Sequence, residues 1–323
     1  MGSILSGYIE YKTENVKAGI ELLFDTNFLL GLLDLNTPES THTCRKIIEV
    51  TKNHGYKFSV LKDTINEGRS LLKARSENFE FVFLQKRVYP EDIYNACERR
   101  KLNKADLERI ADNLEAEIQK YGIEIIQDTT KYRNLAKFSS DFESLKKFRN
   151  SEMAALHDST ALQYVREKRK KKIKDFENVP CWFLNNATSR DKYEVKAGGQ
   201  ENNDAQPETI KADDFLNIIW LSNPNIHQSV DVQELSDIGL SSLISAGLTD
   251  SLPKLSIIKE LDENIQKYSQ DDGLTDADVV RIATRITTRQ LTDLDQLNKL
   301  ANENKGAFVK RLNEEAKKQR ELE

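Results

Sequence analysis

The chain has 323 residues, of which 31% are charged and 38% hydrophobic, and its formal net charge is −5. At roughly 150 residues per domain, this length predicts about two domains. The negative net charge excludes a globally basic nucleic-acid-binding protein, but it is compatible with a local basic patch.

The sequence also indicates a compartment. No run of 18 apolar residues is present, so we expect no membrane span. Residues 1–8 lack the basic and long apolar segments of a signal peptide. The three cysteines, Cys44, Cys97 and Cys181, are far apart and form no CxxC pair, which disfavours a disulfide framework or a zinc site. We therefore expect a cytoplasmic protein.

Short apolar runs that alternate with helical patterns predict an α/β domain with a largely parallel sheet up to about residue 226. The first predicted strand is the apolar run at residues 19–24, which ends at Asp25. Further strands are predicted at residues 56–60, 122–126 and 179–184 and around Ile210. Helices are predicted at residues 40–54, from 63 or 64 onward, over most of 77–120 with a break at Pro90, at 139–149, at 151–172 and from Asp213.

Every segment after Ser229 has a helical pattern, and Thr275 to Asp278 predicts a capping box. Residues 227–323 hold 18 acidic and 13 basic residues, so they carry the whole net charge. We expect an α/β domain over residues 1–226, with a helical insertion at about 77–150, and a helical C-terminal region over 227–323. That region either contacts a protein partner, mediates homo-oligomerisation or covers the sheet.

Three acids stand where a metal site would form. Asp25 follows the first strand, Glu67 lies on the helix after the second, and Asp158 lies among apolar residues of a later helix. Active residues gather at the carboxyl ends of parallel strands, and carboxylates there suit Mg²⁺ or Mn²⁺. Such an ion activates water and stabilises charge on a phosphoryl centre. The alternatives are a helix cap for Asp25 and a solvated helix face for Glu67.

Other polar residues near these acids have two interpretations. Asn185 and Asn186 end the fourth strand and are either turn residues or site residues. His157 precedes Asp158, so on a helix it points about 100° away from it. We therefore expect His157 to be a structural histidine.

Together the motifs resemble those of the PIN-domain nucleases over about residues 20–224. The resemblance consists of Asp25-Thr26-Asn27 after a strand, a helical Glu67, a helical Asp158 after an insertion, and a capped helix with Leu216 and Trp220 after the last strand. It implies a Rossmann-like α/β/α fold and a nuclease dependent on Mg²⁺ or Mn²⁺. By position, Asp25, Glu67 and Asp158 would bind metal and orient water. Thr26 or Asn27 would support Asp25 and the scissile phosphate.

The chain departs from the family pattern at two places. The family often has Thr-x-Asp after the fourth strand, where this chain has Asn185-Asn186-Ala187, so the fourth acid is missing. Asp191 is close enough in sequence to replace it. The gap between Glu67 and Asp158 is also longer than usual, which indicates an inserted helical element that shapes substrate entry.

A basic segment begins two turns after Asp158. Seven of the nine residues from Arg166 to Lys174 are basic. One interpretation is a ridge that tracks nucleic-acid phosphates beside the metal site, and the other is a solvated helix end. The residues assigned to the ridge are Arg166, Lys168, Arg169, Lys170, Lys171 and Lys172.

The sequence therefore predicts a metal-dependent endonuclease that acts on RNA in preference to single-stranded or structured DNA. Its size and helical tail suit a regulated nuclease in bacterial defence or RNA regulation. The alternative is a catalytically degenerate PIN-like module that binds nucleic acid or a protein.

Overall fold

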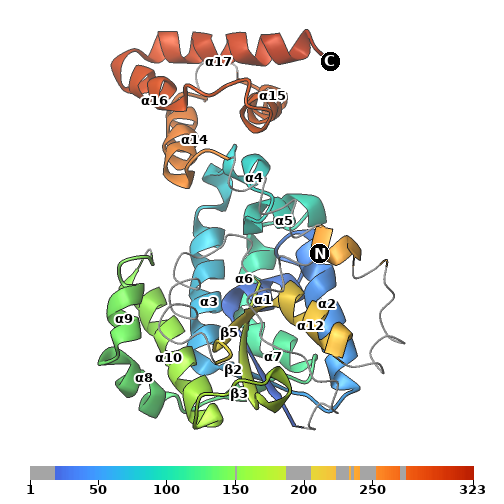
Figure 1. Cartoon of the computed structure of the whole chain (residues 1–323). Coiled ribbons are helices and arrows are strands. Elements are labelled where there is room, and N and C mark those ends of the chain that lie inside the picture. Colours follow the sequence, from blue (N-terminus) through green and yellow to red (C-terminus); the bar gives the residue numbers. More distant parts are fainter. Residues whose placement is uncertain are drawn as a thin grey trace. The chain divides into compact units, whose positions relative to one another are not determined.

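A computed structural model describes residues 19–149, 151–186, 205–222, 233, 236–240, 252–269 and 274–323 (Figure 1). Among these residues, no helix combines the length and the apolar character needed to cross a membrane. Contacts between residues divide the chain into two compact units, which are described separately below. The first contains the described residues within 1–34, 38–71 and 110–246, and the second those within 35–37, 72–109 and 247–323.

The first unit is built on a five-stranded sheet, and all its strand pairs are parallel. The strands lie in the order β3-β2-β1-β4-β5. They are β1 (Glu21–Phe24), β2 (Lys57–Leu61), β3 (Glu124–Ile126), β4 (Cys181–Asn185) and β5 (Thr209–Lys211). The predicted α/β class with a parallel sheet is confirmed.

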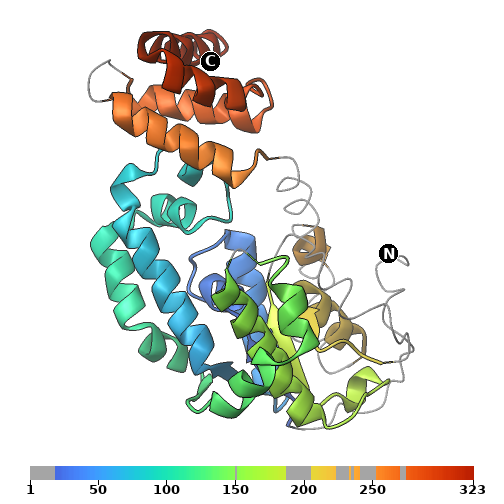
Figure 2. The same cartoon turned by 90° about the vertical axis from the view of Figure 1, so that its left-hand side faces the viewer.

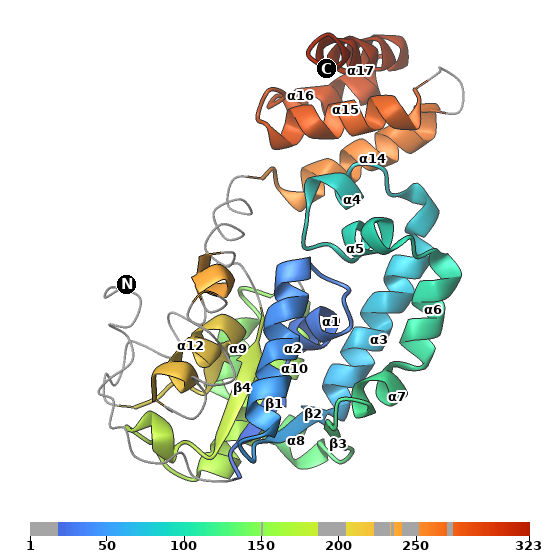
Figure 3. The same ribbon diagram turned by 90° about the vertical axis from the view of Figure 1, so that its right-hand side faces the viewer.

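Helices cover both faces of this sheet. They are α1 (Thr26–Leu32), α2 (Pro38–Lys52), most of α3 (Lys62–Glu77), α7 (Leu114–Gln119), α8 (Thr130–Lys137), α9 (Ser140–Leu145), α10 (Glu152–Arg169) and α12 (Ala212–Ser222). The helices α8 and α10 lie over one face (Figure 2), and α2 and α12 lie over the other (Figure 3). Strands covered on both sides are apolar throughout, and Leu22, Leu23 and Phe24 of β1 are each 0% exposed.

Alternate side chains of the central strands enter two different apolar layers. Leu23 packs with Val165 of α10, because its side chain points to that face. Phe24 points the other way and stacks on Phe28 of α1 at a centroid distance of 4.1 Å. This period of two fixes β1 in register, and it thereby fixes the position of the residue that follows the strand.

Two helices were not predicted from the sequence. The helix α1 starts directly after Asp25, and α8 lies between β3 and α9. The predicted helix at residues 151–172 is α10, and it ends at Arg169 because Lys170 adopts a left-handed conformation with φ 60°. The strands and the main helices otherwise lie within a few residues of the predicted ranges.

The second unit joins two segments that are distant in sequence. Its helices are the end of α3, α4 (Gln85–Val88), α5 (Ile93–Arg100), the start of α6 (Lys104–Asp112), α14 (Leu255–Ser269), α15 (Asp276–Thr287), α16 (Leu294–Glu303) and α17 (Lys305–Arg320). A short 3-10 helix, η2 (Phe79–Phe81), precedes α4. Leu84 and Val88 are buried in one apolar cluster with Ile258, Ile282 and Phe308. The predicted capping box of Thr275 and Asp278 is present at the start of α15.

A buried carboxylate also joins the two segments. Asp262 of α14 is 4% exposed, and it accepts backbone N–H bonds from Phe83, Leu84 and Gln85 at 3.2, 2.6 and 3.1 Å. It therefore caps the start of α4. The predicted boundary near residue 226 separated these segments. Contacts between residues group residues 72–109 with the described residues of 247–323.

Candidate metal centre

The strand order reverses at β1. The strands β2 and β3 lie on one side of it and β4 and β5 on the other, so the carboxyl ends of β1 and β4 flank a topological switch point. Open parallel sheets bind ligands at this place. Asp25 follows β1 directly, and its backbone N–H donates to Leu184 of β4 at 2.9 Å. The sheet thus fixes the backbone of Asp25 at the switch point.

Glu67 reaches this position from α3. The Thr26 hydroxyl donates a hydrogen bond to Oε2 of Glu67, so the residue after Asp25 orients the second carboxylate. Gly68 allows α3 to approach closely, since a Cβ there would lie 3.3 Å from Leu114 Cδ2 and 3.8 Å from Thr26 Cγ2. The structure therefore brings Asp25 and Glu67 together, as predicted.

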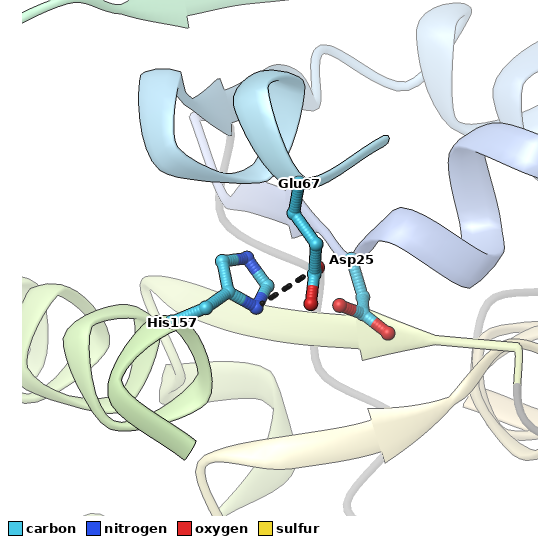
Figure 4. Close-up of side chains that lie close together, drawn as sticks. All are labelled: Asp25, Glu67 and His157. Atoms are coloured by element: carbon cyan, nitrogen blue, oxygen red, sulfur yellow. Dashed lines mark ion pairs between the residues drawn. The ribbon is translucent and has the colours of Figure 1, made fainter. Parts of the chain in front are cut away.

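The third member of the group is His157 of α10, which the sequence analysis treated as structural. Its side chain points toward both carboxylates (Figure 4), and its Nδ1 lies 3.3 Å from Glu67 Oε2. Potential ligand atoms of Asp25, Glu67 and His157 all lie within 4.8 Å of one another. On the other side of the ring, Nε2 lies 2.7 Å from the hydroxyl of Thr64, which is 0% exposed.

Asp158, the third predicted metal ligand, already contacts two other side chains. Its Oδ2 accepts a hydrogen bond from Arg149 Nε at 2.5 Å, and its Oδ1 lies 3.1 Å from His157 Nδ1. It lies beside the three-residue group and outside it. The sequence argument compared helix directions only, whereas the imidazole of His157 is long enough to reach the carboxylates from its own direction.

Two pKa values show the electrostatic character of the group. Burial raises the pKa of Asp25, the negative charges of Asp158 and Glu67 act in the same direction, and the pKa reaches about 7. Burial by itself would lower the pKa of His157, but its hydrogen bond to Asp158 and the negative charge of Glu67 outweigh burial. The pKa of His157 is thereby raised to about 9, so at neutral pH its imidazolium balances the carboxylates.

The supporting polar residues are only partly where the sequence placed them. Thr26 is buried and orients Glu67, while Asn27 is exposed. Asn186 donates its amide to the Ser40 hydroxyl. Asn185 is buried at the end of β4, and neither asparagine belongs to the ligand group. Asp191, suggested as a replacement for the missing fourth acid, lies outside the described residues.

The prediction of a phosphate-binding ridge beside the metal ligands is wrong in position. Lys168 pairs with Glu21 at the start of β1 at 2.9 Å, and Arg169 donates to the carbonyl of Cys181 at the start of β4 at 2.9 Å. These contacts place the end of α10 at the amino edge of the sheet. Eleven residues separate Lys168 from His157, which corresponds to about 16 Å along a helix.

Two of the residues predicted to contact phosphates, Arg166 and Arg169, already interact with other residues of the first unit. Arg166 forms ion pairs with Asp141 and Glu208. Arg169 is 7% exposed and lies over the ring of Trp182. These arginines fix the end of α10, whereas Lys168, Lys170, Lys171 and Lys172 are exposed.

No protein-family model matches the chain, and neither does any curated protein or solved structure. The resemblance in the motifs therefore stays a prediction. The function has to be argued from the geometry at the carboxyl edge of the sheet.

Proposed function

We propose that the chain is a metal-dependent endonuclease of the PIN-like kind, with its active site at Asp25, Glu67 and His157. One observation carries this proposal. Two carboxylates and an imidazole from three separate elements converge within 4.8 Å at the switch point of a parallel sheet. Carboxylate and imidazole donors are ligands of divalent cations such as Mn²⁺, and the two carboxylates also suit Mg²⁺.

Four residues would have separate roles in phosphodiester hydrolysis at this site. Asp25 and Glu67 would hold the cation, and the Thr26 hydroxyl keeps the Glu67 carboxylate directed at Asp25. A divalent cation, when bound, lowers the pKa of a water molecule and neutralises charge on a phosphoryl oxygen. Asp158 would orient His157 and would not bind the cation itself, because its two oxygens already contact His157 and Arg149.

The substrate and the biological setting follow from the motif resemblance and not from the geometry. By that resemblance we propose RNA as the preferred substrate, with single-stranded or structured DNA next. A role in bacterial defence or RNA regulation would suit such an enzyme. Lys170, Lys171 and Lys172 follow the end of α10 at the opposite edge of the sheet, so they would contact only a substrate that extends well beyond the cleavage site.

The test is cleavage of labelled single-stranded RNA, single-stranded DNA and flap DNA in Mn²⁺, Mg²⁺ or EDTA. We expect cleavage that requires metal and that Asp25→Asn and Glu67→Gln each reduce at least 100-fold. Glu77→Gln is the matched control, since Glu77 is an exposed residue at the end of the same helix. Cleavage that persists in EDTA, or in Asp25→Asn, would contradict the proposal.

The degenerate alternative is favoured by one specific observation. Arg149 already neutralises Asp158, and Asn185 and Asn186 stand where the family has an acid, so fewer carboxylates remain for a metal. A degenerate module would bind RNA or a protein without cleavage, and Mn²⁺ would leave its melting temperature unchanged.

A further inference from the structure

The donor set at the switch point differs from an all-oxygen site in one respect, which is the presence of an imidazole nitrogen. Mg²⁺ takes oxygen ligands and retains several waters, whereas imidazole suits transition metals such as Fe²⁺, Ni²⁺ and Zn²⁺, and Mn²⁺ accepts an imidazole beside carboxylates. We propose that Nδ1 of His157 is a direct metal ligand, and that the site therefore selects a transition metal over Mg²⁺. This inference rests on the metal site of the proposed function and adds the identity of its cation.

The imidazole ring of His157 is held in a fixed orientation by a neighbouring hydroxyl. Metal-bound histidines almost always donate their second ring N–H to a neighbouring oxygen, which fixes the tautomer and the orientation of the ring. Thr64 provides such an oxygen, 2.7 Å from Nε2 of His157. When a cation displaces the proton from Nδ1 and the proton on Nε2 remains, the lone pair of Nδ1 is directed at the side of the ring where Glu67 lies.

One helix, α3, supplies both the hydroxyl beside Nε2 of His157 and the carboxylate beside Nδ1. Thr64 and Glu67 are three residues apart on α3, so they lie on the same face of the helix. Thr64 contacts the far nitrogen of the ring, and Glu67 Oε2 lies 3.3 Å from the near one. A single rigid element therefore sets the position of a carboxylate ligand relative to the imidazole.

The side chain of His157 is also buried. The side chain of His157 is 4% exposed, so it cannot leave the group and become hydrated without movement of α10. Carboxylate oxygens of Asp25 and Glu67 lie within 4.8 Å of a nitrogen of this ring. A cation that entered between the two carboxylates would meet Nδ1 directly.

The competing interpretation is that His157 only donates a hydrogen bond to Asp158, at 3.1 Å, and orients it. The two interpretations predict different results for bound metal. A ligand places a nitrogen in direct contact with the ion, whereas an orienting residue leaves only oxygen ligands.

The decisive experiment is pulsed electron paramagnetic resonance of the Mn²⁺-loaded full-length protein. We expect hyperfine coupling to one directly bound nitrogen, and its frequency should change when histidine is labelled with ¹⁵N. Asp25→Asn should abolish the coupling, which excludes binding at another histidine. His42→Gln is the matched control, because His42 is exposed on α2, and it should leave the coupling unchanged. Absence of nitrogen coupling in the loaded wild-type protein would overturn the inference.

Calorimetric titration with Mn²⁺, Co²⁺ and Mg²⁺ gives a second measure. We expect His157→Gln to weaken Mn²⁺ and Co²⁺ binding by at least about 10-fold and Mg²⁺ binding far less, and Thr64→Val to weaken Mn²⁺ binding by about 10-fold. Equal affinity of the wild type for Mg²⁺ and Mn²⁺ would contradict the inference. If His157→Gln fails to fold, the labelled wild-type spectra still decide.

The failure of this inference can be distinguished from the failure of the proposed function. Nitrogen coupling in a protein that cleaves no nucleic acid would support the metal assignment and contradict the nuclease. Metal-dependent cleavage without nitrogen coupling would support the nuclease and contradict the role of His157.

Discussion

The Thr26 hydroxyl donates a hydrogen bond to the carboxylate of Glu67, 41 positions later in the chain. This bond links the residue after Asp25 to the helix that follows the next strand. It means that the carboxylate of Glu67 is oriented by the residue that follows Asp25. The relationship is open to a direct test, because a threonine can lose its hydroxyl with little change of shape.

Thr26→Val should weaken Mn²⁺ binding by about 10-fold, since the Glu67 carboxylate loses the donor that directs it at Asp25. Isothermal titration calorimetry gives the affinity. Thr26→Ser keeps the hydroxyl and should restore most of the affinity. Equal affinities of the valine variant and the wild type would show that Glu67 does not need Thr26 for its orientation.

Asp25→Asn should stabilise the metal-free protein at pH 8. The folded-state pKa of Asp25 is raised to about 7 from 3.8, so its contribution to stability is greatest at low pH and is lost as the pH rises through 7. Asparagine avoids the buried charge, and we expect a gain of roughly 1–3 kcal/mol at pH 8 in EDTA and a smaller gain at pH 5. Urea unfolding measures it, with the exposed Asp112→Asn as control. A loss of stability at pH 8 would argue against repulsion among the carboxylates.

The wild-type protein in EDTA should also lose stability between pH 6.5 and about 9 because of His157. Its folded-state pKa is raised to about 9 from 6.5, so its stabilising effect is complete below 6.5 and is lost as the pH rises through 9. The expected loss is up to roughly 3 kcal/mol. Urea unfolding at pH 6, 7.5 and 9 should show a smaller dependence for His157→Gln, whereas His42→Gln should follow the wild type. Parallel curves for all three proteins would count against a charged His157.

The sequence predicted the strands and the proximity of Asp25 and Glu67, because both follow from local patterns. An apolar run that ends at Asp25 predicts a strand and an acid at its carboxyl end, and the structure confirms both. The local pattern could not show whether His157 or Asp158 lies nearer to the two carboxylates. Neighbouring residues of a helix differ in the length of their side chains as well as in the direction in which these point. Arg149, which engages Asp158, is nine residues away and gives no motif.

The topology of the sheet explains why the basic segment after Val165 lies far from the candidate site. A helix that joins two parallel strands runs antiparallel to them, so α10 has its first turns at the carboxyl edge of the sheet and its end at the amino edge. His157 lies near the first edge and Lys168 near the second. This direction could have been inferred from the predicted βαβ order, whereas the ion pairs of Arg166 with Asp141 and Glu208 depend on tertiary contacts that no local pattern contains.

Gly31→Ala should destabilise the first unit. A Cβ at Gly31 would lie 2.8 Å from both Cys44 Sγ and Ser40 Oγ and 3.1 Å from the amide of Asn186. We expect a loss of about 1–3 kcal/mol, measured by urea unfolding, because this packing cannot expand freely. Gly306→Ala is the control: its nearest neighbour would be 3.7 Å away, and alanine favours helix, so it should be neutral or stabilising. An unaffected Gly31→Ala protein would show that Ser40 and Asn186 can move apart.

Asp262→Ala should release the start of α4. Three buried backbone N–H groups lose their acceptor, and a loss of about 1–3 kcal/mol is expected. Hydrogen exchange should show faster exchange of the amides at residues 83–85, and unchanged exchange in the exposed neighbour Glu263→Ala. Unchanged protection of these amides in Asp262→Ala would indicate another acceptor.

The discontinuous second unit also dictates an order of events during synthesis. Leu84 is synthesised 178 positions before Asp262, so the start of α4 has no cap and no apolar partner from the C-terminal helices during this interval. The first unit has all its strands by Lys211 and can assemble earlier. A chain interrupted before α14 would therefore carry the candidate site together with an uncovered Leu84 and Val88, and exposed apolar side chains of this kind are recognised by quality-control proteases.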